Sequence, residues 1–344
     1  MKVKFLMNWK EYVMAFLKDP LLLSKWQSEY SYDNREGRVT SRVNSGYKSV
    51  VNRDNDTGSV FMFIEDIHLK IMPYRFNRGS YHATLAEDDP ELATIISRAI
   101  GDNQYVDDLS EAVEDFIRSA AHTIFTFSEA YYELLHETNN EGTMTNISVR
   151  YIYPSSMKNI FGWYFQIIPW SVAKQSRIKA GIKKVPREKL LHIKPPKDLG
   201  GKRGVKTLLK QLIALNHVTP DFQIKILEQN RNIGFDLDFY HTEKYLAKAT
   251  ATKKFGWNQR DFRDNNILEY YSIHRILTEA TALAIIRRHI LGTLNSALKS
   301  NLKIDNQILI HNLPTEKTIA TEKIRLLKGG LEFSSILQRI KTLE

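Results

Sequence analysis

The sequence predicts an α+β fold, in which strand-rich and helix-rich stretches occupy different parts of the chain. Three observations predict it. Apolar residues recur at helical spacing after Asp107, two strand-like runs flank a turn between residues 128 and 153, and residues 267–299 form a long helical pattern. The chain has 344 residues and a mass of 39.9 kDa, which is enough for two or three structural units.

The composition limits the class of protein. Hydrophobic residues make up 42% and charged residues 26%, which favours a folded chain over a disordered one. Cysteine is absent, and this removes disulfide frameworks, thiolate metal sites and cysteine nucleophiles. The apolar stretch at the N-terminus is too short for a secretory signal, and no apolar run is long enough to span a bilayer. We therefore expect a soluble intracellular protein with no membrane partner.

The positive charge is concentrated in one segment. The formal net charge is +10, from 49 Lys and Arg against 39 Asp and Glu. Residues 174–206 contain twelve Lys and Arg and two acids, so this segment holds the whole excess. Residues 86–115 contain ten acids and only one basic residue, Arg98. The basic segment could contact a nucleic-acid backbone, or it could pair with the acidic segment of the same chain or of a neighbouring copy.

The first part of the chain alternates loops with short elements. Residues 1–58 predict a loop-rich segment, because their second half is rich in Ser, Asn, Asp and Gly. The aromatic and β-branched run at 59–72 predicts paired strands. Pro90-Glu91 marks a helix start, and the acids at 107–108 open a second helix whose first turn they stabilise.

A strand-rich region follows. Residues 128–136 and 147–153 predict two strands joined by a hairpin turn at 139–142, whose sequence is Asn-Asn-Glu-Gly. Residues 161–168 and 190–194 predict two further strands of this region. The region therefore predicts a sheet built mainly from sequential strands.

Helices dominate the rest of the chain. Paired prolines and glycines at 195–201 break it, and apolar residues from Val205 then predict a helix that Pro220 either interrupts or kinks. Residues 232–265 are polar and aromatic, with a glycine break near each end. The remaining elements are the long helix at 267–299, a strand at 307–311 and helices from Thr315 and Leu331.

We find no catalytic or metal-binding motif in the sequence. None of the ten histidines has a partner at metal-ligand spacing. The acids at 87–89 and 107–108 could hold a divalent ion, but both groups also fit helix starts. Residues 200–207 lie between a strand and a helix, as a phosphate loop does, but one residue too many separates the last glycine from the lysine. A looser anion contact at this helix start remains open, and we expect no cofactor and no metal.

Several motifs follow one another from Ala120 to the C-terminus. A helix, a strand and a hairpin lead to Tyr151-Ile-Tyr-Pro, and the element Val185-Pro-Arg-Glu-Lys-Leu-Leu-His-Ile comes next. Leu199-Gly-Gly-Lys-Arg-Gly then breaks the chain before a long helix. This order resembles the portal proteins of tailed bacteriophages, in which a strand ends in a Tyr/Leu-x-Pro step, a Val-Pro-x-Glu-x-Val/Leu-Leu-His element follows, and a glycine break precedes the stem helix. The resemblance covers roughly two thirds of the chain.

The resemblance implies a ring of typically about twelve copies at one vertex of the virion capsid. Double-stranded DNA would pass through the ring during packaging and ejection, and the protein would perform no covalent chemistry. The implied partners are the terminase large subunit, the major capsid protein and a head–tail connector or adaptor protein, and assembly would take place in the host cytoplasm. The implied parts are an N-terminal segment (1–58), a mixed α/β wing (59–200), a stem helix (201–230), a small clip with the return to the stem (231–265), and a channel-side long helix with wing and crown helices (266–344).

Two sets of candidate residues follow. The residues expected to face DNA in the channel are Lys253, Lys254, Arg260 and Arg263, with Lys202, Arg203 and Lys206 as a second group. The residues expected at a contact between subunits are Lys179, Lys183, Lys184 and Arg187 on one side and Glu87, Asp88, Asp89, Asp107 and Asp108 on the other. Two other functions remain open: a nucleic-acid-binding enzyme or replication protein that uses the acids at 107–115 with a metal, and a head–tail or baseplate component without DNA contact.

Overall fold

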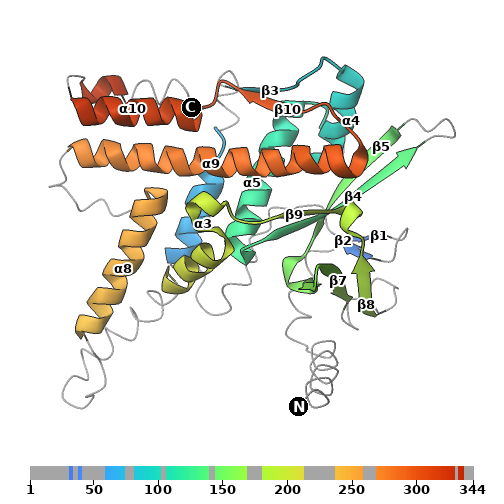
Figure 1. Cartoon of the computed structure of the whole chain (residues 1–344), viewed down its shortest axis with the longest axis horizontal. Helices are drawn as coiled ribbons and strands as arrows, with labels where there is room; N and C mark the ends of the chain where they lie inside the picture. The colour runs from blue at the N-terminus through green and yellow to red at the C-terminus, as the bar shows by residue number, and fades with distance from the viewer. Residues whose placement is uncertain are drawn as a thin grey trace, which may run out of the picture.

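The long helix α9 (Glu269–Leu302) runs across most of the width of the molecule, and other helices lie on both sides of it (Figure 1). Its 34 residues span about 51 Å at the rise of an α-helix. The helix predicted at 267–299 is therefore confirmed, and it continues through Gly292 without a break. This computed structural model describes residues 31–33, 38–40, 59–73, 81–101, 106–138, 144–168, 180–212, 237–258, 269–329 and 332–336.

Helix α10 (Glu316–Lys328) runs back along the N-terminal half of α9 (Figure 1). Thr315 caps it: the Thr315 hydroxyl accepts a hydrogen bond from Thr318 N at 3.3 Å, and the Thr318 hydroxyl accepts one from Thr315 N at 2.9 Å. This capping box starts the helix where the sequence predicts it. Of the helix expected from Leu331, residues 333–336 are described, and they are helical.

Three further helical segments lie beneath α9 and share its core. Phe63, Ile117 and Leu212 each come from a different helix of this layer, and all three are fully buried, as is Ile286 of α9. None of the described helices is long and apolar enough to cross a membrane. The helices of this layer are α3 (Ser59–Lys70), α5 (Leu109–Phe127) and residues 201–212, and α4 (Pro90–Ile100) lies beside them.

The prediction of paired strands at 59–72 is wrong, because this stretch forms the helix α3. Its apolar residues Val60, Phe63, Ile64 and Ile67 follow the spacing i, i+3, i+4 and i+7, which places them on one helical face, and all four are buried. Aromatic and β-branched residues favour strands by composition. Here the burial of this face against α5, where Phe63 and Phe125 pack edge to face with ring centroids 5.8 Å apart, outweighs that preference.

The central sheet has the strand order β5-β4-β9, and both pairs are antiparallel. The strands predicted at 128–136, 147–153 and 190–194 are thereby confirmed as its members. Tyr131 of β4 lies opposite Ile152 on one side and His192 on the other. The predicted hairpin turn at 139–142 lies outside the described residues. The strands are β4 (Ala130–Thr138), β5 (Met144–Ile152) and β9 (Leu190–Ile193).

The described strands outside the central sheet form three smaller sheets. A second three-stranded antiparallel sheet contains the strand predicted at 161–168, which begins at Trp163. The segment 1–58, predicted to be loop-rich, contains one short antiparallel strand pair. The sheets are β6 (Met157–Ile160) with β7 (Trp163–Ile168) and β8 (Gly181–Val185), β3 (His82–Leu85) with β10 (Ile308–His311), and β1 (Ser31–Asp33) with β2 (Arg38–Thr40).

Helix α8 (Leu237–Phe255) occupies much of the segment that the sequence shows only as polar and aromatic. Polar and apolar residues are mixed around this helix, so periodicity does not reveal it. Its last turn is nevertheless anchored, because Ala251 and Phe255 are buried in the main core. Gly256 follows with φ +64° and lies against the backbone of α9. The C-terminal end of α8 therefore lies against the N-terminal part of α9, and the rest of α8 extends away from it (Figure 1).

Candidate functional site

Two segments that are distant in sequence meet at the C-terminal end of α8. Lys253 and Lys254 lie in its last turn, and both are exposed. A Cβ atom built on Gly200 would lie 2.9 Å from Lys254 Nζ. The Lys254 ammonium group therefore stands over the turn that opens the helix at residues 201–212. The structure thus brings Lys254, from one group of residues suggested for DNA, next to the turn that precedes the other group.

The helix at 201–212 carries further cations toward solvent. Arg203, Lys206 and Lys210 are all exposed, and their spacing of i, i+3 and i+7 places them on one face. Lys210 is absent from the predicted set, although its position four residues after Lys206 is a signal that the sequence already contains. We call the group Arg203, Lys206, Lys210, Lys253 and Lys254 the basic surface.

Lys202 has a different role from its neighbours. Its Nζ donates a hydrogen bond to Glu129 Oε2 at 2.5 Å, and His192 Nε2 lies 3.4 Å from the same oxygen. Burial alone would raise the pKa of Glu129, but the hydrogen bonds from His192 and Lys202 outweigh it and lower this pKa to about 2. Lys202 is thus committed to an ion pair between the helix start and the loop before β4, which makes it a poor candidate for DNA contact.

Three other predicted residues cannot be placed. Arg260 and Arg263, predicted to face DNA, lie outside the described residues, as does Lys179, predicted at the subunit contact. Of the residues predicted to face DNA, the structure describes Lys253, Lys254 and the three in the helix 201–212.

Most of the predicted acidic contact residues have partners within the chain. Asp89 caps α4 by accepting a hydrogen bond from Leu92 N at 3.0 Å, and Asp108 caps α5 by accepting one from Ser110 N at 2.9 Å. Asp107 pairs with Arg98, with Nε and Oδ1 2.7 Å apart. Of the five, Glu87 and Asp88 are exposed, cap no helix and form no side-chain ion pair with another described residue.

The predicted basic contact residues lie in or next to the second sheet. Lys184 of β8 stands over the ring of Trp163, with its Nζ 3.3 Å from the ring centroid, which is a cation–π contact. Lys183 is half-buried on the same strand. Arg187 is exposed in the single turn η3 (Arg187–Lys189) between β8 and β9.

The acids at 107–115 do not converge on a metal site. Glu114 is buried, and its two oxygens accept hydrogen bonds from Tyr81 Oη at 2.6 Å and from Arg118 Nε at 2.9 Å. Asp107 and Asp108 are occupied as described above. Across the described ranges, no group of three or more His, Asp or Glu side chains could hold a metal ion. The open enzyme hypothesis therefore gains no structural support from these acids.

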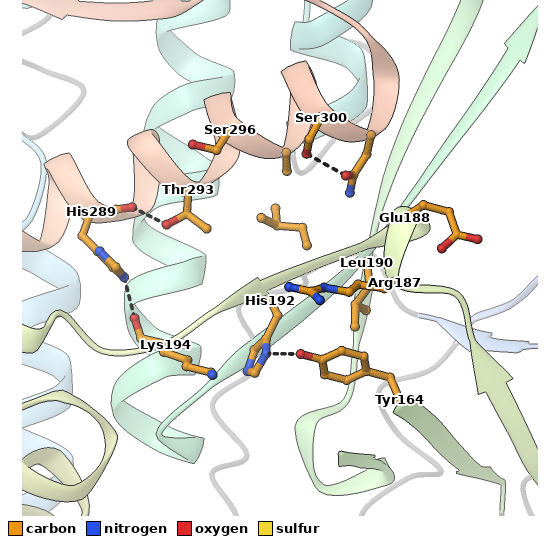
Figure 2. A pocket seen from close by; sticks show the side chains of 13 residues that line it. Tyr164, Arg187, Glu188, Leu190, His192, Lys194, His289, Thr293, Ser296 and Ser300 are labelled. Carbon is orange, nitrogen blue, oxygen red and sulfur yellow. Dashed lines mark hydrogen bonds between the residues drawn. The ribbon is translucent and has the colours of Figure 1, made fainter. Parts of the chain in front are cut away.

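An open groove of about 760 Å³ separates β9 and η3 from the C-terminal half of α9. Figure 2 shows that the Arg187 guanidinium group points back beneath α9 toward His192, and the Lys194 ammonium group points toward the same ring, whereas the Glu188 carboxylate points away. His192 Nδ1 lies 3.2 Å from Tyr164 Oη, and burial lowers the pKa of His192. The groove is lined by Tyr164, Arg187, Glu188, Leu190, Leu191, His192, Lys194, His289, Thr293, Ser296, Ala297, Ser300 and Asn301.

Comparison with known proteins adds no family assignment. No protein-family model matches the chain, and no curated protein matches it in sequence. The fold combines helices and sheets and is built on one long helix. The surface carries the basic surface, along the helix 201–212 and at the C-terminal end of α8, and an open groove with two cationic side chains. Function is inferred from these features.

Proposed function

We propose that this chain is a portal-like subunit that forms a ring at one capsid vertex of a virion and conducts double-stranded DNA. The ring would have about twelve copies. The terminase large subunit, the major capsid protein and a head–tail connector or adaptor protein would dock on it. The proposal rests on the order of motifs from Ala120 onward and on one structural observation, the basic surface.

The basic surface supports a channel because it combines residues from both sides of the proposed clip. Arg203, Lys206 and Lys210 precede the proposed clip in sequence, and Lys253 and Lys254 lie in the return to the stem, at the C-terminal end of α8. In the proposed arrangement, the helix at 201–212 begins the descending stem and α8 is the returning leg, so their cations face the same space. The long helix α9, whose N-terminal part lies against the C-terminal end of α8, then leads to the wing and crown parts.

The DNA affinity expected of the basic surface also suits a channel through which DNA moves. DNA affinity falls steeply with salt in proportion to the number of phosphates that a protein neutralises. Flexible lysines on helix surfaces attract phosphates without the fixed geometry that base recognition needs. A ring lined in this way would hold the duplex near its axis and still let it slide.

The first experiment is to image the purified protein down its symmetry axis and to measure its mass in solution. We expect a closed ring whose channel admits a duplex, which requires an opening of about 20 Å or more. A monomer whose nuclease activity depends on magnesium would instead support the enzyme hypothesis. A ring too narrow for DNA would support the head–tail or baseplate hypothesis.

The second experiment neutralises the basic surface. Lys253→Ala/Lys254→Ala should leave ring assembly intact and lower the amount of packaged DNA, because both side chains are exposed. Lys299→Ala is a matched control, since Lys299 is an exposed lysine on α9 that pairs with Asp305 at 3.0 Å. If the double variant fails to assemble, these lysines belong to a subunit contact and not to the channel.

A further inference from the structure

The groove between β9 and α9 has the features of a binding site for an acidic peptide segment. Its lining on α9 extends from His289 to Asn301, which is about 18 Å of helix. That length accommodates about five or six residues of extended chain.

The charge in the groove is positive and available. Arg187 and Lys194 are both exposed, and their charged groups point toward the centre of the groove (Figure 2). Within the described part of the chain, neither charged group has an ion-pair or hydrogen-bond partner. The hydroxyl groups of Thr293 and Ser296 donate to helix carbonyls at 2.7 Å each, so their oxygens remain free to accept from a peptide N–H.

The same chain carries an exposed segment that fits this groove in charge. Residues 86–91, with the sequence Ala-Glu-Asp-Asp-Pro-Glu, are all exposed and include four acids; we call them the acidic loop. Its last two residues, Pro90 and Glu91, begin α4. Asn306 holds the backbone of this loop, because it accepts from Glu87 N at 2.9 Å and donates to Glu87 O at 2.8 Å. A loop that is already ordered loses little conformational entropy when it binds.

The groove and the acidic loop lie on opposite sides of α9 (Figure 1). A contact between them in two different copies would therefore be heterologous, and contacts of this kind form a ring when the rotation between copies closes and an open filament when it does not. We propose that the groove receives the acidic loop of a neighbouring copy, with Arg187 and Lys194 facing Glu87 and Asp88. This inference rests on the proposed ring and specifies the contact that builds it.

The test is a charge swap, followed by sedimentation velocity over a concentration series at low ionic strength. Arg187→Glu and Asp88→Arg should each weaken self-association about tenfold, because each replaces an attraction with a repulsion. The double variant Arg187→Glu/Asp88→Arg should recover association. Lys317→Glu is the matched control, since Lys317 is an exposed lysine on α10 that does not line the groove. The melting temperature of each monomer verifies that the exposed substitutions leave the fold intact.

The outcomes separate this contact from the ring itself. A wild-type chain that never associates overturns the proposed function. A wild-type ring that both single variants leave unchanged overturns the groove contact alone. If Arg187→Glu weakens the ring and Asp88→Arg does not, the groove takes a different acidic partner, and the acidic loop is the wrong occupant. Failure of the double variant to recover likewise overturns the pairing.

Discussion

Lys202 and Glu129 are 73 residues apart in sequence, and their side chains meet at 2.5 Å. Lys202 stands at the start of the helix 201–212, and Glu129 stands between α5 and β4. The pair therefore joins the proposed stem to the proposed wing. His192 of β9 lies 3.4 Å from the same carboxylate, which connects the pair to the groove as well.

We predict that Glu129→Gln destabilises the fold by about 1–2 kcal/mol, which is less than for a fully buried pair because Lys202 is partly exposed. The loss arises because the Lys202 ammonium group loses its charged partner. Urea denaturation monitored by circular dichroism measures the change. Asp198→Asn is the control: it breaks an exposed pair with Arg288, and it should cost less than about 0.5 kcal/mol. Equal losses in the two variants would show that the Lys202 pair is an ordinary surface contact.

The pH dependence of stability should reveal the same carboxylate. The pKa of Glu129 in the fold is about 2, below the ordinary value of 4.5. A depressed pKa stabilises the fold above the ordinary value, and this contribution is lost as the pH falls from 4.5 toward 2. We expect wild type and Glu129→Gln to differ in melting temperature at neutral pH and to converge at about pH 2. A difference that is constant across this range would contradict the assignment.

Gly256 should tolerate no side chain. It has φ +64°, and an added Cβ would overlap the α9 backbone at Arg275 and Glu279. Gly256→Ala should therefore destabilise by about 2–4 kcal/mol, because α8 must move away from α9. Gly292→Ala is the matched control within α9, where an added Cβ meets nothing within 4 Å. It should stabilise by about 0.5–1 kcal/mol, and both changes are measurable by urea denaturation.

Arg118 should not be replaceable by lysine. Its guanidinium group donates to four carbonyl oxygens at the end of α3, those of His68, Leu69, Met72 and Pro73, at 2.6–3.0 Å. It also pairs with Glu114 at 2.9 Å. A lysine ammonium group has the charge but not the planar fork of donors, so we expect Arg118→Lys to cost about 2–4 kcal/mol. Hydrogen exchange should show early opening at the end of α3, and unchanged protection there would contradict this role.

Elements with local signals were predictable from the sequence. Asp89, Asp108 and Thr315 each cap a helix where the sequence indicates a start, because capping depends on residues within one turn. The strands β4, β5, β7 and β9 and the helix α9 also follow from periodicity. The prediction at 59–72 failed because composition was given more weight than spacing, although the helical spacing of Val60, Phe63, Ile64 and Ile67 is present in the sequence.

The sequence by itself determined the α+β composition of the fold, the helix starts and the separation of basic and acidic segments. Only the tertiary structure decided which of these charges remain available. In the folded chain, Lys202 pairs with Glu129, and Asp89 and Asp108 cap helices. The charged groups of Arg187, Lys254 and Asp88 remain at the surface. The physical reason is distance along the chain. Caps and periodic faces form within a few residues, whereas ion pairs and surfaces depend on packing between segments that no local pattern records.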